Sequence, residues 1–483
     1  MALKKVLTLP TVISTSAGIT LATSCFVAAM QVASYMAGDS AWLAIVVAGS
    51  LTLLAALSFS ELNGLLPSAS GIRLYFTRAY GNSVSLTISI FYVFTMIAVV
   101  GTEAYVFAQV VKQVLPTVPP FLWALIMIGS VVFMNIRGVK IAGRFQDTIT
   151  YGLIISLLIF AFLALIKNGF AVTQPLTVSS AGGLLNAVAV GVFLFIGFEW
   201  VTPLAEEVTQ VKLVSKGMLI AIGILSIVYG VFTVAMTSTV PKAQLVGSPV
   251  PHIIFARKLL GSTGLIWMVI LSFSASITTF NAGALGASRL IYATAREHAL
   301  PAILNRLSVK HFTPWTAVTA VGVICLAVAA IVFATGHYLT LVDVGAGIVS
   351  LVYALAGLST FRLRRKMADA ERPFKIKGGA LIPLATFVVF LLLMVVVLSQ
   401  DTWAAIYIVI GLIISAAYVR WVVPKLKQKH QATKRGPSRR PRPAQIEETL
   451  IGNTVEDADF LISITNSAPN SNLSNIDSDK TDV

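Results

Sequence analysis

Long apolar runs dominate the chain, and short polar or basic segments separate them. The runs are about 20 residues long and recur about twelve times, and this length lets a helix cross the hydrocarbon core of a bilayer. From residue 424 onward the chain is basic and then rich in Asn, Ser and Asp. The pattern predicts an all-α integral membrane protein, followed by a cytoplasmic tail over 424–483 that is basic at first and then disordered.

Composition and charge distribution support a membrane protein. Of 483 residues, 57% are hydrophobic and 11% are charged, with a mean hydropathy of +0.86, whereas soluble domains carry about 25% charged residues. The net charge of +15 does not indicate nucleic acid, because the basic residues follow the membrane topology. If the amino terminus is cytoplasmic, the outward loops hold only five of the 35 Lys and Arg residues, which are Lys112, Lys167, Lys242, Arg257 and Lys258. This asymmetry predicts a multi-pass plasma (inner) membrane protein with both termini in the cytoplasm.

Two acids inside apolar runs are candidate functional residues, because a carboxylate there costs about 2–3 kcal/mol or more. Glu199 lies in the stretch GVFLFIGFEWVTPLAEE, close to Gly197, where a membrane helix can unwind and free backbone groups to bind a solute. Glu103 lies well inside the third run, where a transport role and structural hydrogen bonding remain equal alternatives.

Other polar segments carry weaker signals. The first run contains SAGITLATSCF, which predicts either a small-residue packing face or a second broken helix. The eighth run is rich in hydroxyls that mostly bond their own helix, with Thr278 and Thr279 as candidate ion ligands. Glu61 and Arg73 belong to a turn-rich inner loop that suggests a gate or hinge. His252 is expected at the surface, with no second His or Cys at metal-ligand spacing.

Enzyme signatures are not found in the sequence. The chain has no HExxH-like pair, no GxSxG and no GxxxxGK[ST] phosphate loop, so neither an intramembrane enzyme nor ATP-driven transport is expected. Cys25 and Cys325 lie inside apolar runs and are expected to behave as small hydrophobes rather than as a disulfide. We expect no metal and no cofactor other than a coupling proton or sodium ion.

Six motifs, in order and spacing, resemble the amino acid-polyamine-organocation permease superfamily. They are SFSELNGLLPSASGIRLYFTRAYG, NIRGVKIAGRFQ, FLFIGFEWVTPLAEEVTQ, NAGALGASRLIYATAREHALP, FTPWTAV and LRRKMADAERPFKI. The resemblance implies a five-plus-five inverted repeat with broken helices 1 and 6 and two peripheral helices. The permease domain would cover 1–423, with repeats at about 10–167 and 181–361, and peripheral helices at about 379–422.

The same resemblance implies a substrate site between the two broken helices. Family members usually carry Gly-Ser-Gly in the first break, whose amides hold a substrate carboxylate, but this chain has Ala22, Thr23 and Ser24 there, after Thr20. The loss of both glycines predicts a narrower or different substrate. In the second break, the pattern predicts an aromatic gate at Phe193. The pocket wall and free carbonyls would come from Phe195, Ile196 and Gly197.

Coupling is left open by the sequence. Proton-dependent relatives often have a lysine in span five, but none occurs between Arg144 and Lys167, and Tyr151 to Leu153 occupy the expected position. Three mechanisms therefore remain: Glu103 carries a proton, a sodium ion uses Thr278 or Thr279 with carbonyls of the first span, or the protein exchanges or facilitates without an ion. Glu199 corresponds to an acid beside the break that takes part in gating or proton transfer.

These observations predict a secondary transporter that moves amino acids or related amines by alternating access, as a symporter or exchanger. The alternative is a channel-like facilitator or a substrate sensor with the same fold. The expected partners are a small-molecule substrate and the lipid bilayer, not nucleic acid. The sequence does not specify an oligomeric state.

Overall fold

The computed structural model describes residues 7–68, 70–137, 139–178, 180–206, 208–308 and 313–435, without the side chains of 97, 139–145, 206 and 432–435. The chain divides into two compact units, Met1–Lys427 and Gln428–Val483. Most of the predicted tail, residues 436–483, lies outside the described residues, so its disorder stays a prediction.

Within the described ranges the chain is helical, apart from turns, loops and one isolated bridge between Leu7 and Val208. In order, the α-helices are α1 (Leu9–Thr20), α2 (Ser24–Ser34), α3 (Ala41–Leu65), α4 (Ile72–Tyr80), α5 (Asn82–Lys112), α6 (Pro120–Arg137), α7 (Val139–Lys167), α8 (Ala181–Gly191), α9 (Lys212–Thr239), α10 (Lys242–Leu245), α11 (Pro251–Arg296), α12 (Trp315–Thr335), α13 (Tyr338–Lys366), α14 (Leu381–Gln400), α15 (Thr402–Ala417) and α16 (Val423–Arg435). Shorter helical segments are η1 (Val192–Phe195), η2 (Phe198–Glu206), η3 (Ala302–Asn305) and η4 (Tyr418–Val422).

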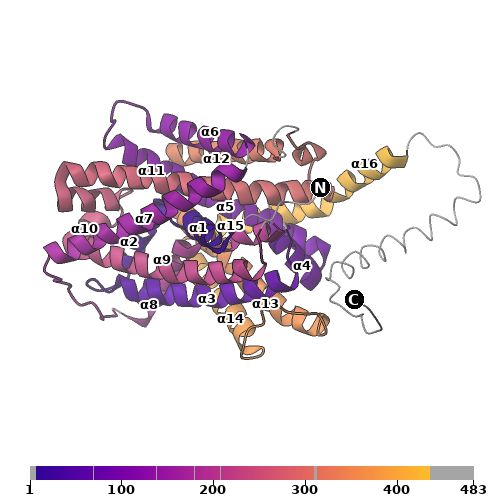
Figure 1. Cartoon of the computed structure of the whole chain (residues 1–483), viewed down its shortest axis with the longest axis horizontal. Helices are drawn as coiled ribbons and strands as arrows, with labels where there is room; N and C mark the ends of the chain where they lie inside the picture. Colours follow the sequence, from indigo (N-terminus) through magenta and orange to yellow (C-terminus); the bar gives the residue numbers. More distant parts are fainter. Residues whose placement is uncertain are drawn as a thin grey trace, which may run out of the picture. The chain divides into compact units, whose positions relative to one another are not determined.

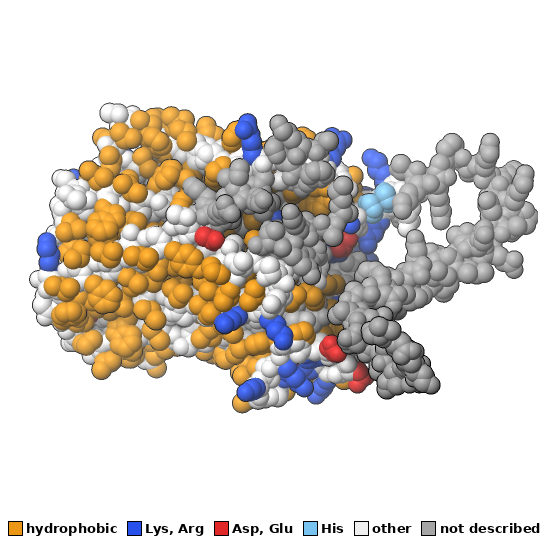
Figure 2. Space-filling view, viewed as in Figure 1, with side chains coloured by type: hydrophobic (Ala, Val, Ile, Leu, Met, Phe, Trp, Pro, Cys, Tyr) orange, Lys and Arg blue, Asp and Glu red, His pale blue; other side chains and the backbone are white. Residues whose placement is uncertain are grey.

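The long helices of the first unit run side by side, with α10 at one end of the bundle and α4 at the other (Figure 1). Eleven helices in the described part of the chain are long and apolar enough to span a membrane, or up to twelve if α1 and α2 count as one bent span. Apolar side chains cover most of the face of this bundle shown in Figure 2, as expected for a surface that contacts lipid. The predicted number and kind of spans are therefore confirmed.

Burial separates central from peripheral helices. The most apolar window of α13 is 78% buried, whereas the corresponding windows are 33% buried in α14 and 22% buried in the span that begins with α15. The last two spans are therefore among the more exposed of the described spans, as is α6 at 28%, and this agrees with the predicted peripheral position. The repeat boundaries at 10–167 and 181–361 stay a prediction, although the first span of each set of five is broken.

The two breaks have different local causes. The axes of α1 and α2 differ by 61°, and the residues between them are Leu21 to Thr23. In the sixth span, α8 passes into the 3₁₀ segment η1 and resumes after Gly197 as the 3₁₀ segment η2. Pro203 lies inside η2 and has no N–H to donate, so the second half of this span does not form a regular α-helix.

Two clusters of ionised groups connect helix ends near α4. Glu61 of α3 accepts a bidentate contact from Arg364 of α13, at 2.7 Å to Nε and 2.6 Å to Nη2, and lies 3.5 Å from Nε of Arg372. Arg73 of α4 pairs with Glu297, directly after α11. The turn-rich loop predicted as a gate or hinge therefore connects four helices at this end, and its gating role stays a prediction.

Candidate functional site between the two helix breaks

The first break places polar backbone groups in the buried interior. The α1 helix ends at Thr20, and its carbonyl accepts hydrogen bonds from Tyr229 Oη at 2.6 Å and from the N–H of Ala22 at 2.9 Å. The Thr20 hydroxyl donates to Ser16 O at 2.7 Å, within its own helix. Thr20, Ala22, Thr23 and Ser24 are all buried, so the break lies inside the protein rather than at a membrane surface.

The second break contacts the first. Gly197 has φ +109°, which L side chains rarely adopt, and a Cβ at this position would lie 2.9 Å from Cγ2 of Ile19 in α1. The Ser16 hydroxyl donates to the carbonyl of Phe198 at 3.0 Å. A glycine is therefore required at residue 197, both for the backbone turn and for the close approach of α1.

The aromatic residues before the second break point to different neighbours. A Cβ built at Gly345 of α13 would lie 3.2 Å from Phe193 and 3.5 Å from Ile196, so both side chains face α13. Phe195 instead lies 2.9 Å from a Cβ built at Gly49 of α3, and its ring centroid is 6.2 Å from that of Tyr229. The predicted gate at Phe193 and pocket wall at Phe195 stay predictions, and the contacts described for Phe195 are packing contacts.

Glu103 of α5 caps the amino terminus of α2. Its Oε1 accepts the N–H of Thr23 at 2.9 Å, and its Oε2 accepts the N–H of Ser24 at 2.8 Å. The Ser276 hydroxyl of α11 also donates to Oε1, and it lies 2.8 Å from the Thr23 hydroxyl. We call Thr23 N and Ser24 N the α2 amide pair. These are the donors predicted to hold a substrate carboxylate, and here they hold a side-chain carboxylate of the protein itself.

Glu199 lies on the other side of the second break and is held by two tyrosines. Tyr92 of α5 donates to Oε1, and Tyr353 of α13 donates to Oε2 at 2.7 Å. The Tyr92 ring stacks on Trp200, with centroids 4.7 Å apart. Glu199 is fully buried, and its hydrogen bonds connect η2 to α5 and α13 in the bundle interior. Its role in gating stays a prediction.

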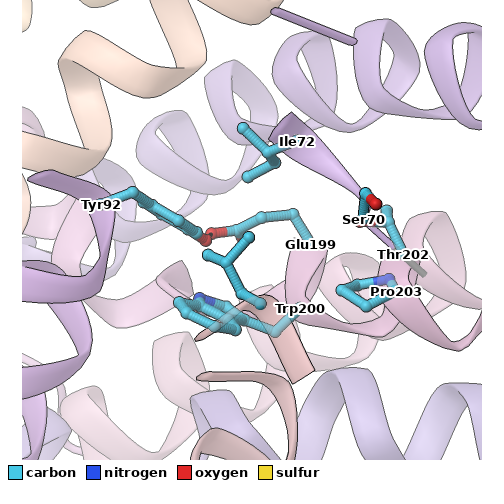
Figure 3. A pocket seen from close by; sticks show the side chains of 8 residues that line it. Ser70, Ile72, Tyr92, Glu199, Trp200, Thr202 and Pro203 are labelled. Atoms are coloured by element: carbon cyan, nitrogen blue, oxygen red, sulfur yellow. Dashed lines mark hydrogen bonds between the residues drawn. The ribbon is translucent and has the colours of Figure 1, made fainter. Parts of the chain in front are cut away.

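A small cavity adjoins Glu199, and Figure 3 shows the side chains around it. Its volume is about 10 Å³, close to the room that one water molecule needs. Thr202 lines this cavity, and its buried hydroxyl has no partner among the described residues. The cavity is too small for an amino acid, so it is not the substrate site in this conformation. It is lined by Ser70, Ile72, Tyr92, Glu199, Trp200, Thr202, Pro203 and Leu290.

The hydroxyls of α11 divide as the sequence predicted. Those of Ser272, Ser274 and Thr278 bond carbonyls of their own helix at 2.8–2.9 Å. Thr279 instead donates to the carbonyl of Gly18 at 3.2 Å, next to the first break. Of the two predicted ion ligands, only Thr279 is therefore seen to contact a carbonyl of the first span.

The α7 residues that face the first break are amides and hydroxyls. A Cβ at Gly18 would lie 2.1 Å from Nε2 of Gln146 and 2.5 Å from the Thr150 hydroxyl. Gln146 also accepts a hydrogen bond from Asn281 at 3.4 Å. A Cβ at Gly152 would have no atom within 4 Å in the described structure. The residues opposite Gly18 thus precede the expected Tyr151 to Leu153 in α7, by five positions for Gln146 and by one for Thr150, and they carry no charge.

His252 is completely buried, and the expectation of a surface position is wrong. Its ring lies 4.8 Å from the ring of Phe26, centroid to centroid. The residues before the irregular turn at Gly261 form a separate helical segment of α11. In this segment His252, Phe255 and Leu259 share a buried face, whereas Arg257 and Lys258 are exposed. The three-to-four-residue spacing could have revealed this burial from the sequence.

Tyr92, Tyr353 and Ser276 were missed as site residues. Tyr92 precedes Glu103 by eleven positions, or about three helical turns, so one face of α5 carries both. This spacing could have identified Tyr92 as a candidate site residue from the sequence. The contacts of Tyr353 and Ser276 depend on residues 154 and 173 positions away, and no local pattern indicates them.

Two broken, buried helices in contact, inside a bundle of membrane-spanning helices, define the class of secondary transporters with discontinuous helices. Comparison with known proteins assigns the family. Residues 7–419 match the family model described as "Amino acid permease", and the chain belongs to this family of transporters.

Similar proteins include the human Asc-type amino acid transporter 1, which is 26% identical over 72% of this chain and 69% of its own length. The Bacillus subtilis (strain 168) branched-chain amino acid permease BcaP is 26% identical over 62% of this chain and 63% of its own length. The human large neutral amino acids transporter small subunit 2 is 28% identical over 68% of this chain and 64% of its own length. For the last two, the matched region is less than two thirds of the relative's length.

Solved structures agree on the fold. The crystal structure of a manganese transporter from Eremococcus coleocola superimposes with a TM-score of 0.57, over 87% of this chain and 94% of that one. Its sequence identity to this chain is 13%, so this likeness concerns the fold alone. It supports the predicted all-helical membrane fold.

Proposed function

We propose that this protein is a secondary carrier that moves amino acids or related amines between the breaks of its first and sixth spans by alternating access. The contact of the two breaks in the buried interior is the observation that supports this best. Thr23, Ser24, Glu103 and Phe193 are at most 2% exposed, so a ligand reaches them only when helices move. The names of the relatives, which include Asc-type, branched-chain and large neutral amino acid transporters, support the choice of substrate class.

For orientation, we propose that both chain ends face the cytoplasm of a cell whose plasma membrane holds the protein. The clusters around Glu61 and Arg73 lie at helix ends connected by basic loops. Basic residues are retained on the cytoplasmic side during membrane insertion. The carboxyl ends of α7 and α9 and the α10 segment carry few basic residues, so they would then face outward.

For coupling, two groups are candidates. Thr279 and the Gly18 carbonyl offer oxygen ligands for a sodium ion, beside the first break. Glu103 is an acid that could exchange a proton while it contacts the α2 amide pair. Gln146 and Thr150, which face Gly18 from α7, are neutral and support neither a fixed positive charge nor proton binding at that position.

Uptake into proteoliposomes that contain the purified protein tests this function. Labelled amino acids and amines are offered to vesicles that are empty, preloaded with unlabelled substrate, or given an inward sodium or proton gradient. We expect saturable uptake and counterflow, because a carrier must return between its two orientations. Non-saturable uptake without counterflow would instead identify a channel-like facilitator.

The gradient arms of the assay also assign the coupling group. Acceleration by sodium that is lost in Thr279→Ala would assign the ion to the Thr279–Gly18 position. Acceleration by a proton gradient that survives in Thr279→Ala would point to Glu103. Acceleration only by preloading would make the protein an exchanger.

The variant Ser24→Trp tests whether the first break lies on the substrate path. The indole would fill the space at the amino terminus of α2, where Ser24 is fully buried, so we expect uptake to fall to background. Membrane insertion should remain, since the apolar length of the first span does not decrease. Normal uptake by a correctly inserted Ser24→Trp protein would remove the first break from the substrate path.

A further inference from the structure

The donors at the amino terminus of α2 are fully used by the protein itself. Five consecutive N–H groups, from Ala22 to Phe26, have acceptors. Three donate to carbonyls of the same segment at 2.9–3.2 Å. The remaining two, the α2 amide pair of Thr23 and Ser24, donate to the two oxygens of Glu103.

This arrangement leaves no obvious place for a second carboxylate. The carboxylate of an amino acid would need the same two N–H groups, because oriented backbone donors are what makes a helix amino terminus attractive to anions. It would also approach the Glu103 carboxylate at close range in a buried region, where like charges repel strongly. With Glu103 in place, a zwitterion lacks donors and meets a repulsive charge.

The groups that remain at this position accept a cation instead. A carboxylate offers about four acceptor sites. At Glu103, Oε1 receives two hydrogen bonds and Oε2 receives one, so Oε2 keeps free acceptor capacity. The Ser24 hydroxyl is also fully buried and has no hydrogen-bond partner among the described residues. An ammonium group, which donates up to three hydrogen bonds, complements these oxygens.

We propose that Glu103 is a built-in occupant of the α2 amide pair, and that the ligand of this site is therefore a protonated amine without a free carboxylate. The inference rests on the proposed transport function and specifies its substrate class. Alkylamines carry their proton at neutral pH, since their pKa lies near that of lysine, about 10.4. Glu103 then has two roles, to close the end of α2 and to supply the counter-charge for the amine.

A matched substrate series tests this on the wild-type protein. In the proteoliposome assay, leucine, leucinamide and 3-methylbutylamine share one apolar side chain, but only leucine has a carboxylate. Ornithine and putrescine form a second pair that differs by the carboxylate. We expect each carboxylate-free compound to be taken up, or to compete with labelled putrescine, at concentrations at least about tenfold lower than its parent amino acid. The reverse order in both series would overturn the proposal.

Two variants separate substrate recognition from a purely structural role of the acid. In Glu103→Gln, we expect uptake of amines to fall at least about tenfold, while the ratio of amino acid to amine uptake rises. Glu371→Gln, which neutralises an exposed acid in the loop after α13, is the matched control and should behave as wild type. An equal fall for amines and amino acids in Glu103→Gln would show that Glu103 only anchors α2, and would also overturn the proposal.

The outcomes distinguish this inference from the function on which it rests. Uptake of amino acids in preference to amines would overturn the amine assignment and leave the carrier function intact. Uptake of neither class by the wild-type protein, under any gradient, would contradict both. If Glu103→Gln does not insert or fold, the wild-type series alone decides.

Discussion

Single positions in this protein are constrained most tightly where helices bend or touch. Gly18 and Gly197 lack side chains at the two breaks, and a Cβ at either would meet a neighbouring helix at less than 3 Å. Glu103 and Glu199 are buried, but each has hydroxyl or N–H donors on both carboxylate oxygens. Such pairing is what permits an acid to lie inside an apolar bundle.

Gly197→Ala should destabilise the protein and abolish uptake. The methyl group would lie 2.9 Å from Ile19 Cγ2, and alanine strongly disfavours φ +109°. Strain of this kind costs about 1–3 kcal/mol before any clash is added. Thermal unfolding in detergent and proteoliposome uptake measure the two effects. Gly152→Ala is the control, because a Cβ at this position has open space in the described structure. Alanine also favours a helix over glycine by about 1 kcal/mol. Equal stability of the two variants would contradict the assigned role of Gly197.

His252→Leu should stabilise the protein. Both ring nitrogens of His252 are buried and have no partner in the part of the chain that the structure describes. An unsatisfied buried polar group costs about 1–3 kcal/mol, and leucine removes that cost, although it loses the contact with the Phe26 ring. An increase in the unfolding temperature in detergent would confirm this. A clear decrease would mean that the imidazole has a partner, such as a bound water or ligand.

Helices in the bundle are positioned through their ends as well as through apolar packing. Lys242 of α10 donates to the carbonyls of Ala33 and Met36 at 3.2 and 2.6 Å, at the carboxyl end of α2. Glu103 closes the opposite end, so α2 has a charged partner of the appropriate sign at each terminus. The helix is also held along its length, because the Phe26 ring lies 5.0 Å from that of Phe232 and 4.8 Å from that of His252.

Glu61→Gln should lower stability and loosen the helix ends near α4. Glu61 is 2% exposed, and it pairs with Arg364 and Arg372, so its neutralisation leaves two guanidinium groups with a weaker partner. Removal of one partner from a buried pair costs about 3–5 kcal/mol, and partial exposure of Arg364 reduces the expected loss to about 2–3 kcal/mol. Thermal unfolding in detergent measures this loss of stability. The control is Asp369→Asn, which neutralises an exposed acid in the same region. Equal unfolding temperatures for the two variants would show that the cluster contributes little.

In the chain as a whole, the features that support a transport function lie in one of the two units. Among the described residues, all helices that qualify as membrane spans start within Met1–Lys427. The family match, over residues 7–419, ends before the second unit begins. The two breaks, Glu103 and Glu199 also lie within this part of the chain.

A protein that ends at Lys427 should therefore keep its fold and its transport activity. The deletion removes Gln428–Val483, the second compact unit. We expect an unchanged unfolding temperature in detergent and unchanged initial rates of uptake in proteoliposomes of neutral lipid. A loss of uptake without a loss of stability would assign a regulatory or transport role to the removed residues.

The class of fold can be predicted from the sequence alone. Apolar runs of spanning length predict membrane helices, because burial of backbone polar groups in lipid permits little else, and this requirement acts on each run separately. Gly197 beside Glu199 likewise indicated the break in the sixth run, since unwinding is a local property, whereas the break in the first run came from the family resemblance. The peripheral position of the last two spans came from the family resemblance, and their low burial agrees with it.

The groups that meet at the breaks could not be predicted in this way, because they come from distant parts of the chain. The sequence indicated that Thr23 and Ser24 could hold a carboxylate, and the structure shows that Glu103, about 80 residues later, supplies it. Tyr353 and Ser276 became site residues in the same way. Such pairings depend on the depth and rotation of each helix in the bundle, which are set by packing among all its neighbours and not by any local pattern.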